Sequence, residues 1–463
     1  KGPAKGKGFG KKGKGAGKGK SKSGKGSGAK GKGPPGGPDG GDDPDHPVAD
    51  ADSFDFRSDD CWQFLDELDI LSEMKKPCPT LRKVPPKHMK SIASKLGMIS
   101  NQAVHALSPV ARERAMKYFF LFPRMVFQAP LRNRHNGRNA KSLYNARTLL
   151  VGERLKSDPE ARFQEYQASL VLSESGLRRS ARIQATQDFN SHLSNEIMRQ
   201  VHEGYISRAS SLASSPGLAC PGEATAQILR NLWNREAHRP TSPWEAPSNS
   251  VRTNIKIAIE NQLHKSLRTA AKGSGAGLSG WRFEYLFPLL RSSSFQWDSF
   301  ANFAAAIAVG DAPWWVRDVL KLGRATALKK GDAGVRPLVC HEPLRRLLTR
   351  ALVFDSRNDV QEYLGPYQFA VGIAGGCPAM ALSVKKIAHH RKSFVFFKLD
   401  LVNAYNTQSR EDALRNLANA SPELESFLRQ FYGSGSQYFF RTGQSEHCII
   451  SAVEGIEQGD AAG

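Results

Sequence analysis

Apolar residues recur at helical spacing along much of this chain. In residues 61–74 they fall every three or four positions, which predicts a helix with an inward face of Trp62, Phe64, Leu65, Leu68 and Leu71. The same spacing predicts helices over residues 249–269 and 343–363, the latter burying Leu344, Leu347, Leu348, Ala351 and Leu352. Two further helices are expected, over residues 409–420 and from Pro422 to Gly433, because Ser409 and Ser421 stand at N-cap positions.

Shorter apolar runs predict strands. Residues 326–338 (TALKKGDAGVRPL) have the pattern of a β-hairpin, with Pro337 expected to end its second strand. Residues 437–441 and 447–451 predict two short strands, and residues 394–399 (FVFFKL) predict a buried strand with Asp400 at its far end. The predicted fold class is therefore α+β, an antiparallel sheet with flanking helices.

Composition adds a strong basic balance. The 463 residues are 40% hydrophobic and 24% charged, as in globular proteins of two or three domains, and the net charge is +22. Twelve lysines and no acid lie in residues 1–33, so the rest of the chain carries 22 − 12 = +10. This balance favours a polyanionic partner, with a charged solubility tail as the alternative. Six cysteines show no metal-ligand or disulfide spacing, which suits a reducing, intracellular location, nuclear and/or cytoplasmic. No apolar run is long enough to cross a membrane.

Shifts in composition mark two regions in the N-terminal half of the chain. Residues 1–47 are expected to be a disordered Lys/Gly-rich arm, and residues 48–222 a mostly helical region ending in a linker over 210–223. Within the second, residues 112–147 mix basic and aromatic side chains, which fits either a single-strand-binding face or a helix core with a solvated face.

Four sequence blocks then occur in a particular order. They are KGSGAGLSGWRFEYL (272–286), LKKGDAGVRPL (328–338), PYQFAVGIAGG (366–376), and FKLDLVNAYN (397–406) followed by EGIEQGDAAG (454–463). From about residue 250 onward this order resembles the fingers and palm of a non-LTR (LINE-type) retrotransposon reverse transcriptase. The resemblance implies fingers over residues 223–393 and a partial palm over 394–463.

The resemblance also implies a site. Asp400 matches the first metal-binding carboxylate of the palm, assisted by the backbone carbonyl of Leu401, and two Mg²⁺ ions are expected in a complete enzyme. Tyr405 matches the aromatic residue that excludes a 2′-hydroxyl. The matching nucleotide-binding residues are Lys329 or Lys330 with Arg336 on the hairpin, and Gln458 with Gly459. RNA template, DNA primer and dNTPs are the implied partners, and Asp400 should lie beside these residues.

One departure affects the chemistry. The paired aspartates of the family's third palm motif should follow the GxxQGD block, and the sequence stops at Gly463. One carboxylate cannot hold two divalent ions, so we expect the chain, taken as a fragment, not to polymerise by itself. Asn406 and Ala461–Ala462 also differ from the residues that are usual in the family at these positions, with little effect on the expected chemistry.

Three alternatives stay open. The stretch around Asp400 also fits a core strand whose last residue caps a helix. The chain also fits a non-catalytic RNA- or DNA-binding protein derived from a decayed retroelement. A palm polymerase of another lineage, such as a group II intron maturase, shares the blocks but rarely the Lys/Gly arm.

Overall fold

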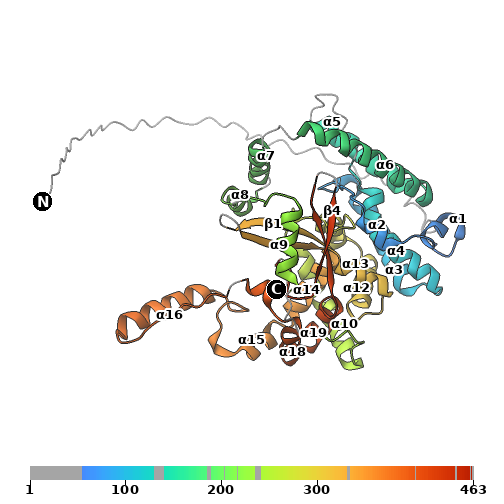
Figure 1. The fold of residues 1–463 in the computed structure, drawn as a ribbon. Coiled ribbons are helices and arrows are strands. Elements are labelled where there is room, and N and C mark those ends of the chain that lie inside the picture. The colour runs from blue at the N-terminus through green and yellow to red at the C-terminus, as the bar shows by residue number, and fades with distance from the viewer. Residues whose placement is uncertain are drawn as a thin grey trace, which may run out of the picture. The chain divides into compact units, whose positions relative to one another are not determined.

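Helices make up most of this protein, around a small mixed sheet of four strands (Figure 1). The computed structural model describes residues 55–129, 140–184, 189–202, 204–215, 217–234, 241–330, 334–401, 403–443, 446–458 and 460. Asp52–Gly463 form one compact unit. The expected disordered arm, residues 1–47, lies outside the described residues. The domain boundaries at residues 222 and 393 stay predictions.

The helical N-terminal region is present. Its elements are α1 (Asp59–Trp62), η2 (Gln63–Leu65), α2 (Ile70–Lys75), η3 (Pro86–His88), α3 (Met89–His105), α4 (Pro109–Val126), α5 (Ala140–Lys156), α6 (Pro159–Gln184), α7 (Phe189–His202) and α8 (Ile206–Ala213). The single helix predicted over residues 61–74 is wrong. It is broken into α1, η2 and α2. The first part ends at Leu65, and Asp69 caps α2 anew by accepting from the Ser72 N–H.

The basic and aromatic helix α4 is core, not a binding face. Its rings pack inward: Phe119 stacks on Trp281 with centroids 4.8 Å apart, and Tyr118 meets Trp62 edge-on. Three of its cations, Arg114, Lys117 and Arg124, are buried as well, whereas Arg112 is exposed. Arg124 is wholly buried and donates to the Tyr166 hydroxyl at 2.8 Å and to the Leu278 carbonyl at 2.7 Å. Of the proposed face, Arg132, Arg134 and Arg138 lie outside the described residues.

The central part of the chain supplies the next helices and the sheet. In order these are α9 (Glu223–Trp233), α10 (Asn249–Arg268), α11 (Phe283–Leu286), η4 (Phe287–Arg291), α12 (Ser294–Ala308), α13 (Trp314–Lys321), β1 (Gly323–Lys330), β2 (Gly334–His341), α14 (Pro343–Asp355), α15 (Arg357–Leu364), η5 (Gly365–Tyr367) and α16 (Gly376–His390). Leucines 344, 347, 348 and 352 are buried as predicted. The predicted helix over 343–363 is two helices, and Ser356 separates them.

The sheet has the order β2-β1-β3-β4, where β3 is Ser436–Arg441 and β4 is His447–Ala452. The predicted hairpin is confirmed, and β1 pairs antiparallel with β2. The sheet is mixed rather than antiparallel throughout, because β1 and β3 pair in parallel at Gly323 and Arg324. The structure also corrects the prediction that Pro337 ends its strand. β2 continues to His341, and proline is tolerated there because β2 is an edge strand.

Helix α9 covers one face of the sheet. Its Leu229 and Trp233 pack with Ala325, Val339 and Tyr438 in a second hydrophobic cluster. In Figure 1 the helix lies across the strands. The linker predicted over residues 210–223 is hydrogen-bonded to β1 of this sheet. Lys329 donates its backbone N–H to the Gly217 carbonyl at 3.0 Å, and the Ala219 N–H donates to the Ala327 carbonyl at 2.9 Å.

The predicted caps near the C-terminus are confirmed. Helix α18 (Arg410–Ala420) follows Ser409, whose hydroxyl accepts from the Asp412 N–H, and α19 (Pro422–Tyr432) is capped by Ser421 in the same way. The short α17 (Ala404–Thr407) precedes them.

The buried strand predicted over residues 394–399 is wrong. These residues carry no regular secondary structure, and Phe397 and Leu399 are 86% and 90% exposed. The run is apolar, but a buried strand also needs a partner strand. No strand of the described residues pairs with this run. The alternative of a core strand fails for the same reason.

Among the described helices, none combines the length and the apolar character that a membrane crossing requires.

Candidate functional site

The β1–β2 hairpin separates the two lysines that the sequence left as alternatives. Directly paired residues share a face, and Leu328 pairs with Arg336, so Lys330 lies on the Arg336 face. Lys329 points to the opposite face, which α9 covers further along the strands. All three cations are exposed. The structure therefore brings Arg336 and Lys330 together and leaves Lys329 apart.

Lys330 connects the hairpin to the NAYN turn. Its ammonium donates to the Asn403 side-chain oxygen at 3.4 Å. Asn403 has a left-handed backbone (φ 54°), a conformation that asparagine tolerates better than most residues. The turn then starts α17, in which Asn406 is buried and Tyr405 is 45% exposed.

The 455–460 loop lies against the same turn. The Ile456 N–H donates to the Tyr405 carbonyl at 2.7 Å, and the Gly455 N–H donates to the Gln408 carbonyl at 3.0 Å. The Gln458 carbonyl accepts from the Val339 N–H at 3.4 Å, which ties the loop to β2. Gly459 lies outside the described residues. Tyr405, Lys330 and Gln458 thus belong to three segments that meet, although they are far apart in the sequence.

Gly455 makes this close approach possible. It has φ +74°, and a Cβ there would lie 2.7 Å from backbone atoms of Tyr405 and Asn406. We expect Gly455→Ala to lower the free energy of unfolding by about 2–4 kcal/mol, because backbone strain and overpacking add. Gly375→Ala is the matched control: its backbone is left-handed (φ +68°) but nothing lies within 4 Å, so it should cost only about 1–2 kcal/mol. Equal losses in urea unfolding would show that contact with Tyr405 and Asn406 is unimportant.

The glycine-rich block before α11 borders the same hairpin. Glu342, at the start of α14, accepts from the Ser279 N–H at 2.8 Å and from its hydroxyl at 2.5 Å. A Cβ at Gly277 would lie within 2.5 Å of that carboxylate. Arg324, on the hairpin face that carries Arg336, donates to the Gly277 carbonyl at 3.4 Å. The glycines therefore allow close backbone packing.

Asp400 is not part of this assembly. It lies in the exposed, irregular segment after α16, as does Leu401, which is 78% exposed. No hydrogen bond or ion pair of the described residues joins Asp400 to Lys330, Arg336 or Gln458. We expected it beside them, and the residues that the structure describes do not form that cleft.

A buried charge network lies behind the loop, and the sequence analysis missed it. Arg345 of α14 donates to the Asp460 carboxylate at 2.7 Å and lies 3.6 Å from Glu457, while Arg410 of α18 lies 3.8 Å from Glu457. The Tyr432 hydroxyl donates to Asp460 at 2.9 Å, and the Tyr438 hydroxyl donates to Glu457. Burial opposes ionisation of Glu457, but Arg345 and its neighbours outweigh it and lower the pKa of that carboxyl. Two cations and two carboxylates leave the network neutral.

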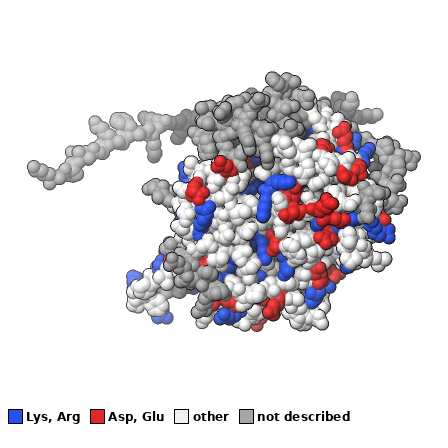
Figure 2. Space-filling model, turned by 45° about the vertical axis from the view of Figure 1, so that its right-hand side comes forward, with Lys and Arg blue, Asp and Glu red and all other residues white. Residues whose placement is uncertain are grey.

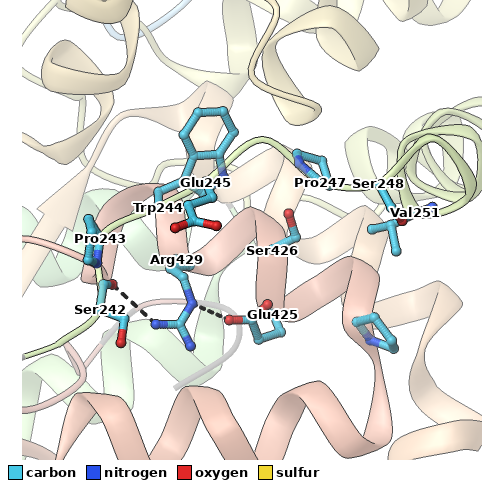
Figure 3. A pocket seen from close by; sticks show the side chains of 11 residues that line it. Ser242, Pro243, Trp244, Glu245, Pro247, Ser248, Val251, Glu425, Ser426 and Arg429 are labelled. Carbon is cyan, nitrogen blue, oxygen red and sulfur yellow. Dashed lines mark hydrogen bonds and ion pairs between the residues drawn. The ribbon is translucent and has the colours of Figure 1, made fainter.

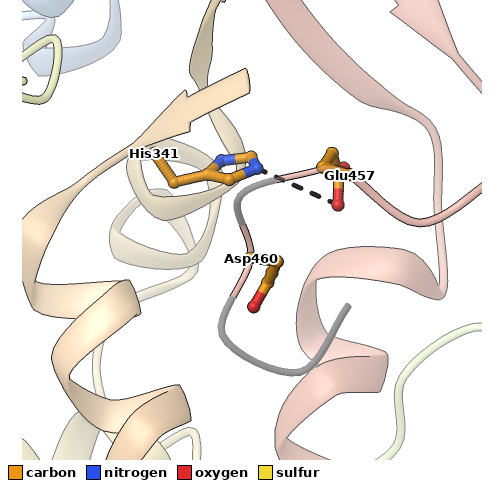
Figure 4. A group of neighbouring side chains, drawn as sticks. All are labelled: His341, Glu457 and Asp460. Atoms are coloured by element: carbon orange, nitrogen blue, oxygen red, sulfur yellow. Dashed lines mark ion pairs between the residues drawn. The ribbon is translucent and has the colours of Figure 1, made fainter. Parts of the chain in front are cut away.

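This network includes the one group of three metal-type ligands among the residues the structure describes: His341, Glu457 and Asp460 (Figure 4). The arginine already supplies the cation, because one guanidinium nitrogen of Arg345 lies 3.2 Å from His341 Nδ1 and another binds Asp460. A divalent ion would add two uncompensated positive charges in a buried place. The group therefore fits an arginine-held loop anchor and not a metal site.

His341 should make stability depend on pH. Burial, with Arg345 nearby, lowers the pKa of His341 from 6.5 to about 4. The unfolded chain is then protonated first, so acid favours unfolding. We expect the free energy of unfolding to be undiminished above pH 6.5 and to fall by about 3 kcal/mol as the pH drops to about 4.

Urea unfolding across this pH range checks the effect. His341→Gln should flatten the profile, whereas His264→Gln, at an exposed histidine, should leave its slope unchanged. A wild-type slope in His341→Gln would assign the pH dependence to other groups.

A sequence signal for the network existed in α14. Arg345 falls on the same helix face as Leu348 and Leu352, and a cation within an apolar stripe indicates a buried partner. What the sequence did not indicate was which carboxylate binds it.

A separate open cavity of about 360 Å³ lies between residues 242–251 and α19 (Figure 3). Arg429 lines it, but its guanidinium is bound to Glu425, to Glu411 and to the Ser242 carbonyl. Trp244 closes one side, with Arg317 over its ring at 4.5 Å. The cavity contains none of the predicted site residues.

Surface charge is mixed on the face of the molecule that Figure 2 shows. On the face in Figure 2, basic and acidic side chains are interspersed, without one dominant basic patch. The twelve lysines of residues 1–33 lie outside the described residues.

No family model matches this chain, and no curated protein matches its sequence. The resemblance to reverse transcriptases therefore depends on the sequence blocks alone.

Proposed function

We propose that this chain carries the fingers and part of the palm of an RNA-directed DNA polymerase of the LINE type. One observation supports this proposal most: the hairpin, the NAYN turn and the GxxQGD loop meet, through Lys330 with Asn403, Tyr405 with Ile456, and Val339 with Gln458. Three blocks that match one family's motifs in order are expected to meet if the family's site is built from them.

In this proposal Lys330 and Arg336 hold the nucleotide triphosphate, because they share a face of the hairpin and are exposed. Lys329 is a less suitable ligand for the triphosphate, since it lies on the opposite face of the hairpin. Gln458 and Gly459 contact nucleotide and template, and Tyr405 contacts the sugar. The partners are RNA template, DNA primer and dNTPs.

Asp400, with the Leu401 carbonyl, is the proposed magnesium ligand. Two Mg²⁺ ions would stabilise the attacking and leaving oxygens of nucleotidyl transfer. The residues described here do not accommodate both ions, because Asp400 belongs to no cluster of ligand side chains. We therefore propose that residues 1–463 alone do not polymerise and that further carboxylates are needed.

Primer extension tests the proposal in two arms. Residues 1–463 with an RNA template, a DNA primer, dNTPs and Mg²⁺ should give no extension. A polypeptide continued past Gly463 along its reading frame should give template-dependent extension. Absence of a paired-aspartate motif from that continued frame, together with an inactive product, would refute the polymerase proposal.

The exposure of Asp400 favours a second candidate, a non-catalytic nucleic-acid-binding protein of retroelement origin. It predicts RNA binding that weakens with salt and is unchanged by Asp400→Ala, with no extension by either polypeptide. Extension by the longer polypeptide would exclude it.

A further inference from the structure

Every side chain from residue 377 to residue 401 is exposed. The segment comprises most of α16, which stands away from the helices around the sheet in Figure 1, and the irregular chain after it. A helix of this length is marginal in water without tertiary contacts, and soluble proteins rarely expose so many large apolar groups together. These groups are Met380, Leu382, Val384, Ile387, Phe394, Val395, Phe396, Phe397, Leu399 and Leu401.

The apolar groups after α16 follow a strand pattern with one fully apolar side. Alternate residues would put Val395, Phe397, Leu399 and Leu401 on one face, and these are 76%, 86%, 90% and 78% exposed. The other face would carry Phe394, Phe396, Lys398 and Asp400. Among the described residues, no backbone hydrogen bond joins 395–401 to another segment.

This segment is complementary to itself. When two copies are placed antiparallel about Leu399, Lys398 of each copy lies opposite Asp400 of the other. Phe397 then lies opposite Leu401, so the apolar faces coincide. An isologous two-fold pairing of this kind satisfies the backbone groups along one edge of each strand, pairs the opposite charges and brings Phe397 against Leu401.

We propose that residues 397–401 pair with the same residues of a second copy of this chain, as the centre of a symmetric dimer. The free strand would gain the partner that the described sheet does not give it, and α16 would supply apolar groups beside it. The proposal does not rest on the polymerase assignment. It does imply that Asp400 cannot pair with Lys398 of the other copy and hold a metal ion at once.

A second copy of this chain is a better partner for the exposed segment than a nucleic acid. Lys398 and Asp400 cancel, so the segment itself has no net charge, and its most exposed face is mainly aliphatic rather than aromatic. Single-stranded nucleic acid is bound by cations with stacked aromatics. The cations Lys385, Lys386, Arg391 and Lys392 lie on and just after the helix, outside the strand.

A charge swap tests the register. The full chain, treated with nuclease, is followed by sedimentation equilibrium over a range of micromolar concentrations. Lys398→Glu and Asp400→Lys should each weaken the dimer about tenfold or more, because two attractive pairs become repulsive. The double variant Lys398→Glu/Asp400→Lys should restore it. Lys392→Glu makes the same charge change outside the strand and should leave the dimer intact.

Leu399 gives a second test, because it lies opposite itself. Leu399→Lys would place two ammonium groups face to face and should leave a monomer, whereas Leu107→Lys, at a leucine 92% exposed elsewhere, should not. Circular dichroism confirms that each variant is folded.

Three results would overturn the proposal: a monomer at every concentration, a dimer unaffected by Leu399→Lys, or single variants not rescued by the double one. Retention of RNA by the segment, lost in Lys398→Glu, with a monomeric protein, would assign it to nucleic acid instead. None of these readouts depends on primer extension, so the dimer and the polymerase proposals can fail separately.

Discussion

Replacing Asp400 with alanine should reduce primer extension by the polypeptide continued past Gly463 by about a thousandfold. A carboxylate that holds Mg²⁺ contributes several kcal/mol to the stabilisation of charge in the transition state, and about 4 kcal/mol corresponds to that factor. The stability should hardly change, because Asp400 is exposed and forms no described ion pair. The prediction therefore separates catalysis from folding.

Asp359→Ala is the matched control. Asp359 is an exposed carboxylate on α15, and its removal should leave both extension and urea unfolding unchanged. Extension that persists in Asp400→Ala at the wild-type rate would remove Asp400 from the metal site. Equal losses in both variants would indicate a general effect of surface charge on nucleic-acid binding.

Arg345→Met should lower the free energy of unfolding by about 3–5 kcal/mol. The guanidinium is fully buried and lies between Asp460 and Glu457, so its loss leaves two carboxylates desolvated with Arg410 as their remaining cation. Arg415→Met removes an arginine whose side chain is 62% exposed and should cost less than about 1 kcal/mol.

A double-mutant cycle shows whether the cost arises from the pair. Asp460→Asn in the Arg345→Met background should recover part of the loss, because it removes the carboxylate left unpaired. Strictly additive losses, or a loss under about 1 kcal/mol in Arg345→Met alone, would mean that water reaches these groups and that the network is not an anchor.

Cap and turn residues predicted local structure, whereas the continuous helices predicted over 61–74 and 343–363 are each interrupted. Ser409 and Ser421 cap their helices as expected, and the hairpin forms, because each depends on residues a few positions apart. The sequence left Lys329 and Lys330 as alternatives, and only the observed register of the hairpin places Lys330 on the face of Arg336.

Features that depend on distant segments were not predictable in the same way. Arg345 and Asp460 are 115 residues apart, and no local pattern pairs them. The strand around Asp400 was expected to be buried because an apolar run is typical of a buried strand, but burial also requires a neighbour. Basic and aromatic residues in α4 were equally consistent with a surface or a core, and the core is what forms.

Pro337 has a consequence for the outer edge of the sheet. The Val339 N–H points away from β1, toward Gln458, and alternate residues along a strand point their N–H groups the same way. Pro337 therefore lacks its donor on the outward side, where no ladder bond is lost. A strand from another molecule that approached β2 would meet one missing donor and one already engaged. The cations of the hairpin can thus be exposed at the edge of the sheet, and β2 does not offer a continuous row of backbone groups on which a fibril could start.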